Sequence, residues 1–442
     1  MKSLDGSTAS MTKKVYVLGA YGLIGSGCVN RLLTAGFEVI GVGRSLEKGL
    51  RSNRQIEWRI TDISKTSQQS WGDILGDADV IVNAAGALQD GPRDNLEAIH
   101  VKLMENITLA LENRNVTFIQ ISAAGADENS STEFMRTKAR GDKILMASKL
   151  HWLIFRPSLV LSRDAYGGTA LLRAAAAFPL INFQIFPQSK VQTVSVEDVS
   201  HAVAKATNGL IPRGTVADLT EPNSQSFGEL KQRFRDWLGF PKWRVNVPVP
   251  RWTVYSIGKI ADFAGLLGWR SPLRTSSLRS LEQGITANAH SWQQTGNLPC
   301  RSLEDTLAAM PATLQERWFS RLYLMLPLSV CGLALFWLAS GAIGLFALDD
   351  ALEVLVSRGI STELSMALVV VGAIADIFLG LAVLMRQFSR LACIGMISLS
   401  VAYLLSSLVT APDLWLDPLG PLVKVIPSII LAVFTMSILD ER

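Results

Sequence analysis

The sequence predicts an α/β fold, a doubly wound parallel sheet with a small lobe, followed by an all-α bundle of four membrane helices. Three observations support this prediction. A glycine-rich turn lies between a strand and a helix near the N-terminus, apolar strands then alternate with helices, and long apolar stretches dominate the end of the chain. We expect a polar tail over 1–13, a nucleotide-binding domain over 14–225, a substrate lobe and linker over 226–310, and a bundle over 320–440.

Charge separates the two main parts of the chain. Residues 1–310 hold 35 Lys and Arg against 28 Asp and Glu, whereas residues 311–442 hold 7 against 10. A hydrophobic content of 49% and a charged content of 18% exclude a disordered or fibrous chain. The basic excess of residues 1–310 can be explained by attraction to anionic membrane lipids, so no nucleic-acid partner is expected. The four Cys and four His residues lack the spacing of metal ligands, so no metal site is expected.

The turn after the first strand carries the pattern of a dinucleotide site. Residues 15–18 form a short apolar run, and Gly19, Gly22 and Gly25 follow it before a helical pattern. Glycines permit the tight turn and let the backbone approach a pyrophosphate, whose charge the helix N-terminus stabilises. The alternative is a glycine-rich turn without a ligand. The residues of this turn expected to contact the cofactor are Gly19, Tyr21, Gly22, Leu23, Ile24 and Gly25.

The alternation of strands and helices continues beyond this turn and predicts a Rossmann-type sheet. Such sheets bind ligands outside the carboxyl ends of their strands. The expected strands lie at 37–42, 57–60, 80–82, 117–121 and 152–155, and the main helices between them at 94–112 and 132–148.

The ends of these strands supply the remaining cofactor contacts. Arg44 lies 19 positions after Gly25, where an NAD enzyme would keep an acid for the ribose 2′-hydroxyl. An Arg suits a 2′-phosphate, so NADP(H) is favoured over NAD(H); a solvated loop cation is the alternative. Asp62 either accepts from the adenine amino group or caps the following helix. The other expected contacts are Ile63, Ala84, Ala85 and Gly86.

Long apolar stretches near the C-terminus predict membrane-spanning helices. Arg317 and Arg321 precede the first stretch, and Arg386 and Arg390 join the second to the third, so these ends are expected in the cytoplasm. We therefore expect a multi-pass protein of the cell inner membrane whose N-terminal domain is cytoplasmic. Asp376, in mid-span, is a proton or substrate group or, as we favour, a structural clamp between helices. The four stretches are 322–348, 364–385, 391–410 and 422–439.

A further helix is expected at 252–269, inside a segment where aromatic and basic residues interleave. Trp residues at both of its ends would suit the headgroup region of a bilayer. An ordinary core helix is the interpretation that we favour.

Motifs at successive strand ends resemble the extended and atypical short-chain dehydrogenase/reductase family over about residues 14–300. Within this family, the chain is similar to the branch that holds the NAD(P)H-binding accessory subunit of respiratory complex I. The membrane part resembles the DoxX-like domain that is found fused to such reductases. The motifs are residues 19–25, Asp62-Ile63, residues 83–86, residues 121–125, Arg156-Pro157-Ser158 and residues 196–199.

The resemblance implies roles for several residues but also reveals a departure. The family's catalytic pair is Tyr-x-x-x-Lys; Lys138 is present, whereas Phe134 occupies the Tyr position. A phenyl ring carries no ionisable proton, so alcohol–ketone chemistry that uses this Tyr cannot operate. The resemblance implies that Lys138 holds the nicotinamide ribose, with an exposed helix lysine as the alternative, and that Pro157 contacts the cofactor. It makes Ser122 a catalytic group that hydrogen-bonds substrate or cofactor; a residue that merely starts a loop is the alternative. Tyr166 is an alternative proton donor.

The sequence therefore predicts a membrane-anchored NADP(H)-binding oxidoreductase that acts on a lipophilic substrate such as a quinone. Hydride transfer to a quinone depends less on a tyrosine acid than ketone reduction does. Membrane lipids and a membrane protein are the other expected partners. The alternative is a non-catalytic NAD(P)H-binding structural or sensing subunit of a membrane complex. This alternative is suggested by Phe134, which stands in place of the catalytic Tyr.

Overall fold

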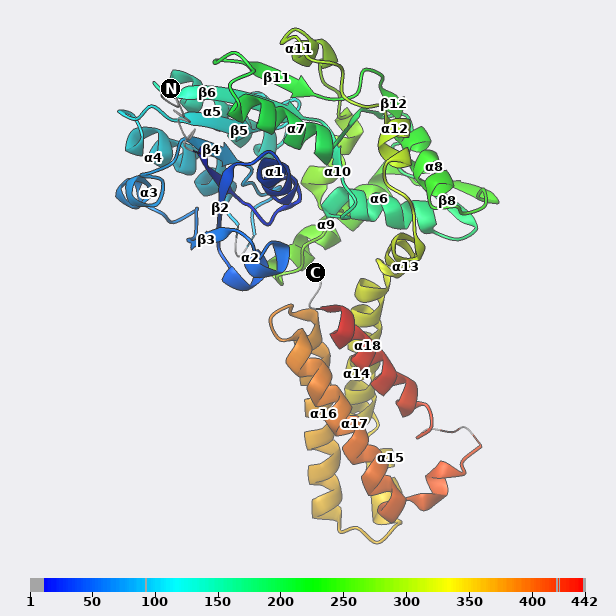
Figure 1. The fold of residues 1–442 in the computed structure, drawn as a ribbon. Helices are drawn as coiled ribbons and strands as arrows, with labels where there is room; N and C mark the ends of the chain where they lie inside the picture. Colours follow the sequence, from blue (N-terminus) through cyan, green and yellow to red (C-terminus); the bar gives the residue numbers. More distant parts are fainter. Residues whose placement is uncertain (1–11, 92–93, 419, 421, 440–442) are drawn as a thin grey trace, which may run out of the picture. The chain divides into compact units, whose positions relative to one another are not determined.

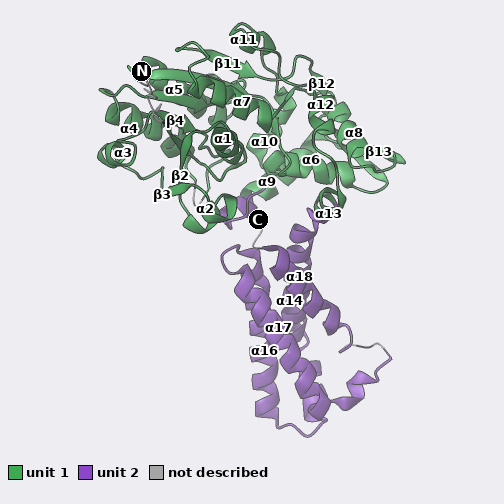
Figure 2. Ribbon diagram, in the orientation of Figure 1, with its two compact units in different colours: residues 1–262, 272–320 green, residues 263–271, 321–442 purple. Residues whose placement is uncertain are grey.

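The computed structural model describes residues 12–91, 94–418, 420 and 422–439 (Figure 1). Most of the expected tail over 1–13 lies outside these residues. The chain divides into two compact units (Figure 2). Unit 1 comprises residues 1–262 and 272–320, and unit 2 comprises residues 263–271 and 321–442.

Unit 1 is built on a seven-stranded, fully parallel sheet, as the alternation of strands and helices predicts. The strand order is β11-β6-β5-β4-β1-β2-β3, so the direction of winding reverses between β1 and β4. Ligands bind beside such a reversal, at the carboxyl ends of the strands. The strands are β1 (Lys14–Leu18), β2 (Glu38–Gly43), β3 (Glu57–Ile60), β4 (Val80–Asn83), β5 (Thr117–Ile121), β6 (His151–Pro157) and β11 (Val216–Leu219).

Helices cover both faces of this sheet, because side chains along each strand alternate between the faces and each face buries its own core (Figure 1). In β1, Val15 and Val17 belong to the core beneath α1 and α7, whereas Tyr16 and Leu18 face α3, α4 and α5. These helices are α1 (Leu23–Thr34), α3 (Gln68–Ile74), α4 (Leu103–Ala110), α5 (Glu133–Ala147) and α7 (Val196–Thr207).

The helix expected at 94–112 differs from its prediction. Residues 96–97 begin it as α-helix, a π-helical turn follows at Ala98–Lys102, and the helix continues as α4. Gly141 of α5 packs so closely on this turn that a Cβ there would overlap the carbonyl oxygen of His100. π-Helical turns occur often at functional sites, and this one positions the His100 side chain.

Unit 1 also contains a lobe with its own hydrophobic core, which includes Leu161, Leu172, Leu230, Phe234 and Leu307. The lobe therefore combines segments that precede and follow α7 and β11. Its main elements are α6 (Gly167–Ala177), β8 (Ile181–Gln184), α8 (Phe227–Trp237), β13 (Val245–Pro248), α10 (Thr275–Gln283) and α12 (Leu303–Ala308).

The helix expected at 252–269 is α9 (Arg251–Leu266). Val254 and Ala261 are buried on one side, as a core helix requires. The opposite side exposes large apolar residues, among them Trp252, which is 73% exposed, and Leu266, which is 75% exposed. The favoured interpretation as an ordinary core helix is therefore wrong for this outward face, because an ordinary core helix presents polar residues to solvent.

Unit 2 contains four apolar helices in its bundle: α14 (Met325–Phe346), α16 (Thr362–Leu384), α17 (Ser389–Thr410) and α18 (Val425–Leu439). The first three are long and apolar enough to cross a membrane, as predicted, whereas α18 has only 15 residues. Helices α14 and α17 each pack against both α16 and α18, so the four helices enclose a common core. A shorter helix, α15 (Leu348–Val356), follows α14.

Asp376 lies in α16 and is 5% exposed. Its carboxylate accepts a hydrogen bond from Ser340 Oγ of α14 at 2.7 Å and from Tyr403 Oη of α17 at 3.3 Å. Both oxygens are thus bound by neighbouring helices, which is the arrangement expected of a structural clamp.

Candidate functional site

The glycine-rich turn connects β1 to α1 and packs against the loop that follows β4. Gly19 has a φ of +71°, and a Cβ on it would lie 2.9 Å from Ala85 Cα. A Cβ on Gly25 would overlap the carbonyl oxygen of Gly19. No side chain caps α1, whose N-cap residue is Gly22. The structure thus brings the predicted turn residues and the loop over 84–86 together at the start of a helix, where backbone amides stabilise a pyrophosphate.

The end of β2 places Arg44 beside the glycine-rich turn. A Cβ on Gly43 would overlap the ring of Tyr21, so this glycine lets the ring lie against the strand end. The amide of Arg44 donates to Tyr21 Oη at 3.0 Å. The guanidinium of Arg44 forms an ion pair with Asp94, with Nη2 2.9 Å from Oδ1. A cofactor phosphate at this position would therefore compete with a carboxylate for Arg44.

Asp62 follows β3 and fixes a turn. Its Oδ1 accepts from the amide of Ser64 at 3.2 Å and from Ser64 Oγ at 2.7 Å. The following helix, α3, is capped by Ser67 instead, whose Oγ accepts from Ser70 N. The prediction that Asp62 caps that helix is therefore wrong, since Asp62 lies six positions before Gln68, the first residue of α3. The adenine contact stays a prediction.

Asn83 holds the loop after β4 in place. Its side chain is buried, donates to Gln120 Oε1 at 2.8 Å and accepts from the amide of Ala85 at 3.1 Å. Two nitrogens converge on the next glycine: a Cβ on Gly86 would lie 3.4 Å from Lys138 Nζ and 3.5 Å from His100 Nε2. The absence of this Cβ leaves room for a ligand group between the loop and α5.

Lys138 lies on α5 and is 4% exposed, so it is not the exposed helix lysine that a surface role would require. Its Nζ donates to the carbonyl oxygen of Ile121 at 3.0 Å. Burial lowers the pKa of Lys138 to about 8, although the charge of Asp142 opposes the shift. The Lys138 ammonium group therefore loses its proton near pH 8, well below the pH at which an exposed lysine does.

His100 is a site residue that no local sequence pattern revealed. Its Nδ1 is 2.8 Å from Thr137 Oγ1, which is also 2.9 Å from the carbonyl oxygen of Glu133. The Thr137 hydroxyl can donate to that carbonyl, so Nδ1 donates to Thr137 and Nε2 is left to accept, as it does from Ala87 N at 3.4 Å. Burial, together with the charge of Lys138, lowers the pKa of His100 to about 2, so the ring stays neutral.

The rings of Phe134 and His100 form an edge-to-face pair, with ring centres 5.6 Å apart and an interplanar angle of 74°. The position that would hold the catalytic tyrosine of the resembled family is thus an apolar contact in this protein. Lys138 is one helical turn further along α5.

Ser122 is engaged by a buried carboxylate. Its Oγ donates to Asp142 Oδ2 at 2.8 Å, and Arg156 donates to the same oxygen through Nη2 at 2.9 Å and Nε at 3.1 Å. Asp142 is 1% exposed, and this network joins β5, α5 and β6. Ser122 therefore lies where it was predicted, but its hydroxyl hydrogen is directed to Asp142. Sequence reasoning missed Asp142, for which only its spacing of four residues from Lys138 was a signal.

The remaining predicted residues occupy strand ends or the lobe. Pro157 ends β6, and its carbonyl oxygen accepts from Ala124 N at 2.9 Å. Ile63 follows β3 and packs against the core on the α4 face. Tyr166 precedes α6 and is 57% exposed, so no buried contact directs its hydroxyl to Lys138.

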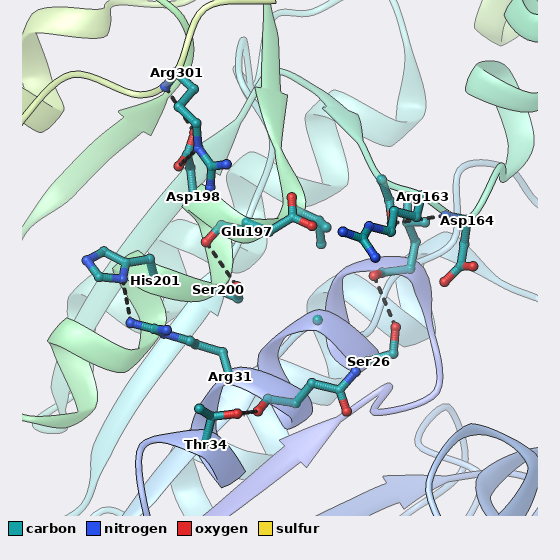
Figure 3. A pocket seen from close by; sticks show the side chains of 15 residues that line it. Ser26, Arg31, Thr34, Arg163, Asp164, Glu197, Asp198, Ser200, His201 and Arg301 are labelled. Atoms are coloured by element: carbon teal, nitrogen blue, oxygen red, sulfur yellow. Dashed lines mark hydrogen bonds and ion pairs between the residues drawn. The ribbon is translucent and has the colours of Figure 1, made fainter. Parts of the chain in front are cut away.

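A cavity of about 640 Å³ lies between α1 and α7 (Figure 3). It includes Leu23 at the start of α1, but its other lining residues lie outside the predicted cofactor contacts. Figure 3 shows Arg31 and His201 side by side, 2.9 Å apart, and Arg301 paired with Asp198 at 3.0 Å. The charged lining does not suit an apolar substrate.

Sequence families match both parts of the chain. A family described as NAD(P)H-binding matches residues 19–209, which include the glycine-rich turn and Lys138. The DoxX-like family matches residues 334–433, which lie within unit 2.

Curated relatives match the N-terminal part at low identity. The NADH-ubiquinone oxidoreductase 40 kDa mitochondrial subunit of Neurospora crassa is 27% identical over 252 residues, which cover 56% of this chain and 64% of that one. The NADH dehydrogenase [ubiquinone] 1 alpha subcomplex subunit 9 of Rattus norvegicus is 26% identical over 276 residues, which cover 57% of this chain and 68% of that one. The match to the fungal subunit therefore spans less than two thirds of its length.

Solved structures share the fold of unit 1. A UDP-glucose 4-epimerase from Thermotoga maritima, solved with UDP-glucose, has a TM-score of 0.51 at 16% identity and covers 67% of this chain and 97% of its own. The enzyme WbmH of Bordetella bronchiseptica, solved with NAD⁺, has the same TM-score, identity and coverage. The chain thus joins an NAD(P)H-binding Rossmann domain to a C-terminal DoxX-like domain.

Proposed function

We propose that this protein is a membrane-anchored oxidoreductase that binds NADP(H) and reduces a lipophilic acceptor such as a quinone. Its DoxX-like bundle would hold it in the cell inner membrane, with the Rossmann domain in the cytoplasm. The observation that carries the proposal is the combination of a complete glycine cradle and a buried Lys138 with a phenyl ring at the tyrosine position.

The residues around the glycine-rich turn fit a dinucleotide. Three missing Cβ atoms, at Gly19, Gly25 and Gly86, keep the turn close to the loop after β4 and leave room beside Lys138. The first-turn amides of α1 would stabilise the pyrophosphate, and Arg44 would exchange Asp94 for the 2′-phosphate. Lys138 would hold the nicotinamide ribose, and Asp62 Oδ2, which lies 3.9 Å from Lys65 Nζ, would accept from the adenine amino group.

The site favours an acceptor that needs no tyrosine acid. A quinone takes one hydride, which bound NADPH supplies, and one proton, which its oxygen can take from water, to become a quinol. Neutral His100 and the Lys138 ammonium border the space at Gly86, and only the ammonium carries a proton to give. The DoxX-like bundle would keep the domain close to acceptors that are dissolved in the bilayer.

Turnover with a panel of acceptors tests this proposal. Full-length protein in lipid nanodiscs should oxidise NADPH when a short-chain quinone is present, and should leave a soluble aldehyde unreduced. The Lys138→Met variant should lose this activity, whereas Lys143→Met, which changes a 73% exposed lysine of the same helix, should keep it. Reduction of aldehydes without reduction of any quinone would overturn the choice of substrate.

A non-catalytic NAD(P)H-binding subunit of a membrane complex is the second candidate. Two contacts favour it: Phe134 packs against His100, and the Ser122 hydroxyl donates to Asp142. The curated relatives are themselves named as subunits of larger oxidoreductases. If the protein binds NADPH tightly but no acceptor in the panel leads to NADPH oxidation, the result would favour this candidate over the oxidoreductase.

The affinity for NADPH should fall as the pH rises above about 8. The Lys138 pKa is lowered to about 8 by burial, so the cofactor-free protein loses this ammonium above that pH and must regain the proton to hold the ribose. The dissociation constant should therefore rise by up to about tenfold per pH unit between pH 8 and 10. Calorimetric titration at several pH values measures it.

The same titrations of two variants serve as controls. Lys138→Met should bind more weakly and lose this pH dependence, and Lys143→Met should retain both the affinity and the slope. A flat profile for the unaltered protein, or a slope that survives in Lys138→Met, would show that Lys138 does not hold the cofactor.

A further inference from the structure

A segment distant in sequence closes one end of the bundle in unit 2. Residues 263–271 belong to this unit, and Trp269 Nε1 donates to the carbonyl oxygen of Leu384 at 2.6 Å. The guanidinium of Arg386 lies 5.7 Å from the centre of the Trp269 ring, and the amide of Arg386 donates to the carbonyl oxygen of Leu267 at 3.0 Å. The segment is therefore bound to the link between α16 and α17 by side-chain and backbone contacts.

The contacts of Trp269 identify which end of the bundle is closed. Trp269 and Leu384, at the end of α16, both pack against a buried cluster that includes Leu326 near the start of α14 and Leu439 at the end of α18. This is the end that carries Arg386, and it is the end predicted to be cytoplasmic. Trp and Arg are the residues that gather where membrane helices meet the headgroups.

Helix α9 leads into this segment and exposes an apolar stripe. Ile260 is 68% exposed, Phe263 is 62% exposed and Leu266 is 75% exposed. Trp252 continues the stripe about two turns before Ile260. At 100° per residue these four side chains fall within a sector of about 120°. Val254 and Ala261, which are buried, lie on the opposite side.

We propose that α9 is an interfacial anchor, whose stripe of Trp252, Ile260, Phe263 and Leu266 inserts among the headgroups of an anionic bilayer. The proposal rests on the membrane location of the bundle but not on the cofactor site. Through Trp269, residues 263–271 hold the C-terminal end of α9 beside the ends of the membrane helices. Phe263 and Leu266 would therefore lie at the level of the lipid headgroups.

The charge and the side-chain types of α9 favour lipid as the molecule that covers the apolar stripe. Residues 251–270 carry Arg251, Lys259 and Arg270 against a single acid, Asp262. Arg251 pairs with Glu282 and Asp262 pairs with Arg274, and Lys259 and Arg270 are the other basic residues of this helix and its end. Lys259 lies within the stripe, where its long side chain can reach the phosphates while its methylene groups stay among apolar neighbours. A helix with Trp, Phe and Leu on one face and basic residues beside them has the composition of an interfacial helix.

A fluorescent depth measurement on the full-length protein tests the anchor. Cys331 is exposed and is replaced in Cys331→Ala, whereas Cys28, Cys300 and Cys393 are buried. In this background, an environment-sensitive dye is attached to Phe263→Cys or to the control Leu298→Cys, which is 85% exposed and lies outside α9. The protein is reconstituted into vesicles of phosphatidylcholine and phosphatidylglycerol that contain lipids with a nitroxide near the headgroup.

The dye at 263 should emit at shorter wavelength than the dye at 298 and should be quenched at least twofold more by the nitroxide lipid. Equal exposure of both dyes to aqueous iodide, without lipid quenching at 263, would overturn the proposal. A blue shift at 263 without lipid quenching would also overturn it, because the stripe would then be covered by protein.

The dependence on anionic lipid separates this surface from the cofactor site. Lys259→Glu should reduce lipid quenching at 263 in anionic vesicles and should have little effect in vesicles of phosphatidylcholine alone. Unchanged quenching in anionic vesicles would contradict the role of charge. NADPH affinity is measured in the same preparations, so failure of the anchor and failure of the proposed function are distinguished.

Discussion

Replacing Asp142 with alanine is expected to lower the free energy of unfolding of the Rossmann domain by about 3 to 5 kcal/mol, the cost of removing one partner from a buried ion pair. Asp142 is 1% exposed and accepts three hydrogen bonds on one oxygen, one from Ser122 and two from Arg156. The Arg156 side chain is 23% exposed, so water can reach part of it and the loss should lie near the lower value. Urea denaturation of the full-length protein in detergent, followed by labelling of the buried thiol of Cys28, measures the change.

Two further variants define the cause of this loss. In Asp142→Ala/Arg156→Met both charges are absent, so part of the lost stability should return, because no unpaired guanidinium remains. Asp73→Ala, which alters an exposed aspartate of α3, should change the unfolding free energy by no more than about 0.5 kcal/mol. An Asp142→Ala protein as stable as the unaltered one would show that the network contributes nothing to folding.

Replacing Arg44 with aspartate should weaken NADPH binding far more than NADH binding, by about 1.5 to 3 kcal/mol, or roughly 10- to 150-fold. The expected cause is the loss of charged hydrogen bonds to the 2′-phosphate, which NADH lacks. Calorimetric titration of both coenzymes gives the ratio directly. Equal losses for both would refute the assignment of Arg44 to the 2′-phosphate.

The ion pair between Arg44 and Asp94 provides a second arm for this test. Asp94→Asn should bind NADPH more tightly than the unaltered protein, because Arg44 no longer has to exchange a carboxylate for a phosphate. Arg51→Asp, which changes a largely exposed arginine of α2 (Leu46–Ser52), should leave the ratio of the two affinities unchanged. A ratio that shifts equally in Arg51→Asp would indicate a general charge effect.

The strands and the glycine-rich turn were predictable because they depend on short-range patterns. Alternating and β-branched apolar runs define each strand, and the expected positions agree with β1 to β6 within two residues at either end. The three apolar stretches that form α14, α16 and α17 were equally clear, since length and hydropathy suffice for them. The fourth is shorter than expected: the stretch at 422–439 yields a helix that starts only at Val425.

The chemistry of the candidate site was less predictable because it depends on which distant segments meet. His100 is neutral because α5 buries it, with Thr137 at one ring nitrogen and Lys138 nearby. Nothing within a few residues of His100 indicates this environment. In the same way, the Ser122 hydroxyl was expected to hydrogen-bond a ligand, but it donates to Asp142, twenty residues further along the chain.

Local patterns of apolar residues and glycines were thus enough to establish a nucleotide-binding α/β domain followed by apolar helices, because each pattern acts over a few residues. Side-chain partners and exposure depended on packing between segments that are far apart in the chain. The direction of the apolar stripe of α9 is the clearest case, because its periodicity is the same whether the stripe faces a core or solvent. Only the buried Val254 and Ala261 show which side the protein covers.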